Sequence, residues 1–190
     1  WLNLFNRFER IPVILRAAGV GGAVGLVAWF EPRLAGGGER IVQSVFDGQV
    51  TLVGLAGLFA ARWLLGTFSY SAGVPGGLFS PLLLVGASFG ALFGETFSAL
   101  FGAALHPLLP DLIPSTPALA VVGMAAFFTA VVRAPLTGLI LIMEMTANTT
   151  LLMPMLAACL SASIAPALLG SAPIYDTLRQ RMLHPDQRRV

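Results

Sequence analysis

The sequence of 190 residues is 56% hydrophobic and only 11% charged, and its mean hydropathy is +0.83. This composition excludes a water-soluble domain, and a net charge of only +2 argues against nucleic-acid binding. Cys159 is the only cysteine, which excludes an intrachain disulfide or a cysteine-based zinc site. Because about 20 apolar residues cross a hydrocarbon core, the long apolar stretches predict helices that span or lie within a membrane.

The N-terminal third of the chain predicts three helices. The first apolar segment covers residues 11–30 and ends before the glycine run at 36–38, since three glycines break a helix. Residues 39–46 predict a helix too short to span. The stretch 50–67 is long enough to cross, and Arg62 near its end is placed to extend its charge to the interface.

A glycine- and proline-containing stretch at 71–77 interrupts the apolar sequence, and the next predicted helix begins near Leu78. Along this helix Gly86, Gly90 and Gly94 recur every four residues. Glycines at this spacing line one face with hydrogen atoms and let a neighbouring helix approach closely.

Three further apolar segments, 117–132, 135–146 and 150–169, follow a polar loop at 106–114. Several are shorter than a perpendicular span requires, so their backbone ends must face protein or a water-filled cavity. Interrupted helices of this kind indicate an ion or substrate site in transporters. The sequence therefore predicts an all-α polytopic membrane protein with short, tilted and interrupted helices.

The strongest candidate site is the predicted helix start at Gly77, Leu78 and Phe79. The first backbone N–H groups of a helix have no intrahelical acceptor, and the peptide dipoles place about half a positive charge there. Pro81 fits the first turn, where its missing N–H costs little. These features predict an anion site without a basic side chain, weak enough to release its ion. A glycine hinge that serves packing alone is the alternative.

Tyr175, in the stretch SAPIYD at 171–176, is the second candidate, because a phenol can donate a hydrogen bond to an anion. An interfacial aromatic anchor is the alternative. Arg133 and Glu144 are eleven residues apart, about three helical turns, so no direct pair between them is expected. Glu144 is expected at a helix end, although an acid in an apolar run is also a functional candidate.

The stretch Gly86-Ala87-Ser88-Phe89-Gly90 matches G-x-S-x-G, the nucleophile elbow of serine hydrolases. That elbow needs a strand, a sharp turn and a helix, whereas this stretch lies in a predicted apolar helix. An intramembrane serine hydrolase and a membrane assembly module are therefore retained only as alternatives, and the chain is not expected to be an enzyme.

Three stretches resemble the CLC family of chloride channels and proton-coupled chloride antiporters. GGLFSP at 76–81 resembles the G-x-F-x-P anion-binding motif, VRAPLTGLILIMEMTANTTLLMPML at 132–156 is similar to a long stretch in the C-terminal half of the transporters, and SAPIYD resembles the segment with the pore tyrosine. The resemblance runs in order from about Gly19 to Arg181. It implies that Leu78 and Phe79 offer backbone amides, and Tyr175 its hydroxyl, to a central chloride.

The resemblance also implies the C-terminal half of an inverted-repeat transport domain over residues 1–190, with no CBS domains in this chain. The N-terminal half, with its pore serine, gating glutamate and proton-transfer glutamate, would complete the pathway, and these residues alone should not conduct. A bacterial inner-membrane homodimer is expected, with residues 135–165 contributing to its interface. Chloride or a similar monovalent anion, protons in an antiporter, and lipid are the expected partners, with no cofactor. Exchange is favoured over a passive channel.

The C-terminus is expected in the cytoplasm. Arg179, Arg181, Arg188 and Arg189 follow the last long apolar segment, and short basic tails of this kind stay on the cytoplasmic side.

Overall fold

The computed structural model describes residues 12–34, 39–47, 50–70, 77, 79–105 and 114–176. Within these residues every regular element is a helix, which confirms the predicted all-α class. The elements in chain order are α1 (Val13–Phe30), the 3₁₀ turn η2 (Pro32–Leu34), α2 (Glu39–Phe46), α3 (Leu52–Tyr70), α4 (Phe79–Leu105), α5 (Thr116–Val132), α6 (Pro135–Thr146) and α7 (Leu152–Leu168).

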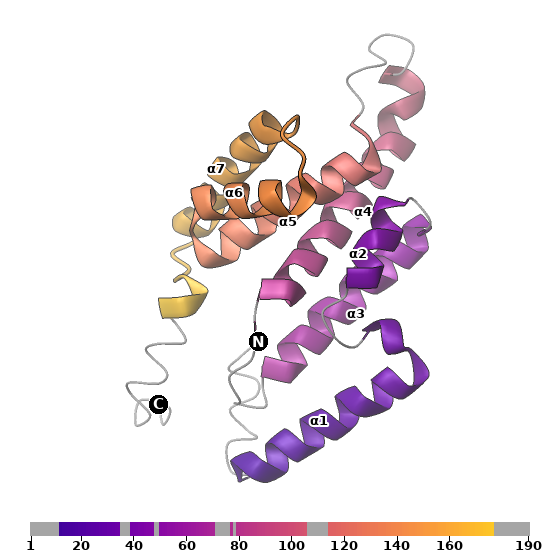
Figure 1. The fold of residues 1–190 in the computed structure, drawn as a ribbon, viewed down its shortest axis with the longest axis vertical. Coiled ribbons are helices and arrows are strands. Elements are labelled where there is room, and N and C mark those ends of the chain that lie inside the picture. The colour runs from indigo at the N-terminus through magenta and orange to yellow at the C-terminus, as the bar shows by residue number, and fades with distance from the viewer. Residues whose placement is uncertain are drawn as a thin grey trace.

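The helices form a layered arrangement around α4 (Figure 1). Helix α4 packs on α3 and α2 on one side and on α5 on the other. Helices α6 and α7 cover α5. Helix α1 packs mainly against η2 and α3. The C-terminal helices α5 to α7 therefore form one packed group, joined to the rest mainly through α4 and by a smaller contact between α2 and α5.

Most predicted segments match the helices to within two residues, and α3 is the exception. It continues to Tyr70, three residues past the predicted end. The prediction for Arg62 is wrong, because this residue lies well inside α3 and its side chain is 7% exposed. The side chain is therefore largely surrounded by protein.

In the part of the chain that the structure describes, two helices are long and apolar enough to cross a membrane, at Leu52–Ser69 in α3 and Phe79–Gly102 in α4. In each of the other apolar helices the apolar stretch is 17 residues or shorter. The shortest of them, α6, has 12 residues. Both α5 and α6 carry a proline in the first two positions, where the ring fixes the backbone angle φ at a helical value. The predicted mixture of long and short helices is thus confirmed.

The closest approach in the fold is between α4 and α5, at the glycines that the sequence singled out. A methyl carbon placed on Gly86 would lie 2.7 Å from the carbonyl oxygen of Gly123, and one on Gly123 would lie 2.8 Å from the α-carbon of Gly90. On Gly94 it would lie 2.9 Å from a methyl of Leu119. The two backbones are in direct contact, as the four-residue spacing predicts.

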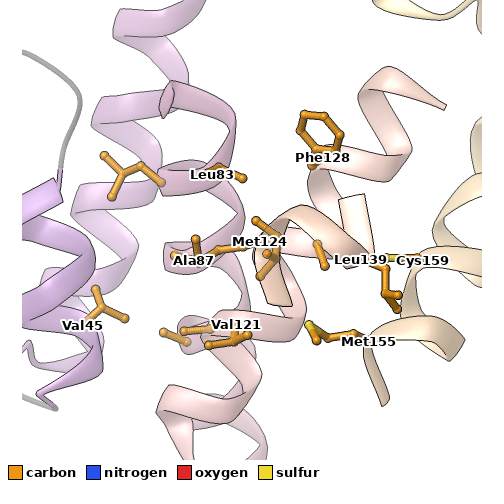
Figure 2. Packing of buried hydrophobic residues seen from close by; sticks show 14 of the residues in the cluster. Val45, Leu83, Ala87, Val121, Met124, Phe128, Leu139, Met155 and Cys159 are labelled. Atoms are coloured by element: carbon orange, nitrogen blue, oxygen red, sulfur yellow. The ribbon is translucent and has the colours of Figure 1, made fainter. Parts of the chain in front are cut away.

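The hydrophobic core extends from this contact toward α7 (Figure 2). Met124 of α5 lies between Ala87 of α4 and Leu139 of α6, and Met155 and Cys159 of α7 lie beyond it. Ala87, Met155 and Cys159 have no exposed surface. The core therefore joins α4, α5, α6 and the first half of α7 into one unit.

Ser88 lies in the middle of α4 and not at a strand-to-helix turn. Its hydroxyl is fully buried and donates to the carbonyl oxygens of Leu84 and Val85, at 2.9 and 3.0 Å. This arrangement contradicts a nucleophile elbow, which requires an exposed hydroxyl.

Candidate functional site

Helix α4 begins at Phe79, with Gly77 exposed just before it. Leu78 lies outside the described residues, so its predicted role stays a prediction. The helix has 27 residues, and Pro81 lies in its first turn as expected. Helix geometry leaves the first four N–H groups without an intrahelical acceptor and gives this end a partial positive charge.

Phe79 attaches the start of α4 to α5. Its ring meets the ring of Phe128 edge to face, with the centroids 5.7 Å apart and the planes at 77°. Edge-to-face pairs of this geometry contribute about 0.5–1.5 kcal/mol beyond the area that they bury. Phe128 is 6% exposed and belongs to the core, so the aromatic pair holds the helix start against a fixed surface.

The end of α5 is built around Arg133. This residue has left-handed backbone angles, φ 64° and ψ 33°, and its N–H donates to the carbonyl oxygen of Thr129 at 2.8 Å. The turn allows α6 to begin at Pro135, two residues later. Gly138 of α6 then packs against α5, since a methyl carbon there would lie 2.7 Å from the Thr129 hydroxyl and 3.0 Å from the ring of Phe128.

The guanidinium of Arg133 donates a hydrogen bond to the backbone carbonyl of Ser171, 38 residues away in sequence. Within 114–176 Arg133 is the only arginine or lysine. Its positive charge lies at the C-terminal end of α5, where the helix dipole favours a cation. Arg133 therefore links the corner between α5 and α6 to the chain that leaves α7.

Helix α7 ends in a turn that brings Ser171 to this position. Gly170 has φ 63°, a left-handed conformation that glycine adopts without a steric penalty. The N–H of Gly170 donates to Ala167 at 3.2 Å and that of Ser171 to Pro166 at 3.1 Å. Residues 174–176, the last that the structure describes, are helical, and the side chain of Tyr175 is 53% exposed.

Both predicted parts of the site are thus attached to the same end of α5. Phe128 holds the start of α4, and Arg133 holds the segment 171–176 that contains Tyr175. The two α5 residues are five positions apart, which is about 7.5 Å along the helix axis. Sequence patterns indicated Phe79 and Tyr175 but not Phe128. They gave Arg133 no role at this site, although a lone arginine between two apolar segments was a visible signal.

Among the described residues no group of three or more His, Cys, Asp or Glu side chains could hold a metal ion. The site consists instead of a helix N-terminus, aromatic rings and one phenol. Such a set can donate hydrogen bonds to an anion without neutralising it by a formal charge.

The fold is that of an all-helical protein with short and interrupted apolar helices, in which the start of α4 and segment 171–176 are attached to the same end of α5. The family model described as "Voltage gated chloride channel" matches residues 1–166, and the chain belongs to this family.

Curated relatives and a solved structure extend the comparison. The chain is 37% identical over 184 residues to the H(+)/Cl(-) exchange transporter ClcA of Vibrio parahaemolyticus, covering 97% of this chain and 38% of the relative. It is 38% identical over 170 residues to the transporter of the same name from Cronobacter sakazakii, covering 90% of this chain and 35% of the relative. The chain thus spans little more than a third of the length of these relatives.

The fold is similar to the X-ray crystal structure of a slow cyanobacterial Cl-/H+ antiporter. The TM-score is 0.83 at 31% sequence identity, and the match covers 98% of this chain and 42% of that structure. The predicted CLC-type fold is therefore confirmed.

Proposed function

We propose that this chain is part of a membrane transporter that moves chloride in exchange for protons. Its relatives from Vibrio parahaemolyticus and Cronobacter sakazakii are named H(+)/Cl(-) exchange transporters, and the similar solved structure is a Cl-/H+ antiporter. Because the chain covers 38% of the Vibrio relative, the rest of the transport pathway comes from other residues. Residues 1–190 correspond in this proposal to the C-terminal half of the transport domain.

The proposed anion site lies where α4 begins. The backbone amides of Leu78 and Phe79 donate to the ion beside Gly77, and the Tyr175 hydroxyl donates from the segment after α7. The observation that carries this proposal is the attachment of Phe79 and of segment 171–176 to the same end of α5. Amide and phenol donors hold a dehydrated anion through partial charges, so the ion can leave again during transport.

A passive chloride channel is the second candidate. The description of the matching family as a voltage gated chloride channel favours it. The two candidates differ in proton movement, because only an exchanger acidifies or alkalinises a liposome when chloride flows down its gradient. A pH-sensitive dye inside liposomes with a chloride gradient separates them: a chloride flux without a proton flux contradicts exchange.

The anion site is tested in a complete transporter that contains this chain. Tyr175→Phe removes only the hydroxyl, and we expect chloride affinity measured by isothermal titration to fall about tenfold, as for one hydrogen bond to a charged group. Phe101→Ala, a truncation of an exposed aromatic far along α4, is the control and leaves affinity unchanged. Equal affinity in Tyr175→Phe and the unmodified protein contradicts the role of Tyr175.

The ion position is tested independently by soaking crystals of the same transporter in bromide. We expect anomalous density beside the start of α4, within hydrogen-bonding distance of the Phe79 amide. Density elsewhere, with none at this helix start, contradicts the site.

The cytoplasmic position of the C-terminus is part of the proposal and rests on its arginine cluster. The only cysteine, Cys159, is fully buried, so the background for thiol labelling is low. We expect a cysteine introduced by Val190→Cys to react with a membrane-impermeant maleimide in inverted vesicles. Labelling in intact cells instead contradicts this orientation.

A further inference from the structure

Two non-glycine residues of the described chain have a left-handed backbone, Arg133 and Ala147. They occupy equivalent places, since Arg133 follows α5 and Ala147 follows α6. A side chain makes this conformation unfavourable, and glycine is the residue that usually occupies it. At Ala147 the side chain is a single methyl group, whereas at Arg133 the long side chain has a partner.

That partner is the carbonyl oxygen of Ser171, which lies just after Gly170 turns the chain away from α7. Arginine suits this role, because its planar guanidinium stays charged and donates from a rigid fork. The hydrogen bond crosses from the corner between α5 and α6 to segment 171–176, in which residues 171–173 are irregular and residues 174–176 are helical. Tyr175 lies four positions after Ser171.

We propose that Arg133 is a positioning residue for anion binding: its guanidinium fixes segment 171–176 against the end of α5 and thereby sets the place of the Tyr175 hydroxyl. The inference rests on the proposed function of Tyr175. Arg133 does not contact the anion in this proposal, because its guanidinium is directed to the Ser171 carbonyl. Loss of the side chain leaves the phenol present but free to occupy several positions, which weakens binding.

Arg133→Gly tests the inference without placing strain on the backbone, since glycine accepts the left-handed angles. Ala147→Gly is the matched control, with the same backbone change at a corner that lacks a long side chain. In the complete transporter we expect Arg133→Gly to lower chloride affinity about tenfold in isothermal titration, while Ala147→Gly leaves it unchanged.

Amide hydrogen exchange reports the link itself, with or without chloride. We expect the peptide containing residues 171–176 to exchange faster in Arg133→Gly than in Ala147→Gly and the unmodified protein. Equal exchange in all three proteins overturns the inference, even if chloride affinity falls.

The double variant Arg133→Gly/Tyr175→Phe separates positioning from a direct electrostatic role. If Arg133 acts through the phenol, the double variant binds chloride no more weakly than Tyr175→Phe alone. Additive losses overturn the inference, because they indicate that the guanidinium attracts the ion itself. Unchanged affinity in Tyr175→Phe contradicts the proposed function, whereas a loss there with none in Arg133→Gly contradicts only the positioning role.

Discussion

Single residues decide how closely α4 and α5 approach. Gly123 of α5 faces Gly86 and Gly90 of α4, and a methyl carbon on Gly123 would lie 2.5 Å from the carbonyl oxygen of Gly86. Backbone atoms cannot move aside as the end of a flexible side chain can. The tolerance for added volume at Gly123 is therefore small.

Gly123→Ala is expected to destabilise the fold by about 1–3 kcal/mol, the usual cost of adding volume to a close-packed contact. Gly102→Ala on α4 is the control, because a methyl carbon there meets only the hydroxyl of Ser98, at 3.4 Å. The measurement is the midpoint of thermal unfolding in detergent. An unfolding midpoint for Gly123→Ala that equals that of Gly102→Ala would disprove the backbone contact.

Ser88 gives a second prediction at this scale. Its hydroxyl bonds only within its own helix, to Leu84 and Val85. We expect Ser88→Ala to change the free energy of unfolding by less than about 1 kcal/mol, as for a single neutral hydrogen bond. A fluorophosphonate probe should not label the unmodified protein at Ser88, and labelling there would restore the hydrolase alternative.

At the scale of elements, a hydrogen bond supports the junction between α4 and α5. The hydroxyl of Thr116, the first residue of α5, donates to the carboxyl group of Glu95 at 2.6 Å. Glu95 lies within α4, ten residues before its end. An acidic side chain at a helix N-terminus also interacts favourably with the helix dipole. The contact fixes where α5 starts along α4.

We expect Thr116→Val to lower the free energy of unfolding by about 1–3 kcal/mol, because it leaves the Glu95 carboxyl without its partner. Thr116→Ser keeps the hydroxyl and serves as the control. Denaturation in detergent measures both variants. The same stability in the valine and serine variants would show that the contact contributes nothing.

Sequence patterns predicted the helices well because apolar runs and their breakers are local features. The end of α3 was misplaced because Thr67 donates to the carbonyl of Trp63 at 2.7 Å, which satisfies a polar group inside a continuing helix. For the site, the glycine spacing predicted a close face of α4, but not that Gly123 would meet it. The partner of Arg133 was not predictable, since a backbone carbonyl such as that of Ser171 has no sequence signature.

At the scale of the whole molecule, large apolar side chains remain uncovered on several helices. On α6 and α7 the exposed large apolar residues are Leu136, Ile140, Met145, Leu152, Met153, Leu160, Ile164 and Leu168. Other exposed apolar side chains lie on α1, which contacts little of the rest of the chain. A second copy of the chain, lipid or the rest of the transporter can cover these surfaces. For α6 and α7 we propose a second copy, in a symmetric homodimer.

Leu160→Arg in the complete transporter is expected to convert a dimer into a monomer, because a symmetric interface would bury two unpaired charges. Ile14→Arg on α1 carries the same charge on a surface outside the proposed interface and should leave the dimer intact. Light scattering in detergent gives the oligomeric state. A dimer that survives Leu160→Arg places the interface elsewhere.

The glycine contact between α4 and α5 has a thermodynamic consequence. Gly86, Gly90 and Gly123 have no rotatable side-chain bonds, so forming the contact removes no side-chain conformational entropy there. Leucine or methionine residues in the same places would each lose part of their rotamer freedom on assembly. In a bilayer, where burying apolar groups against protein gains little over burying them in lipid, this entropic saving favours the association of these two helices.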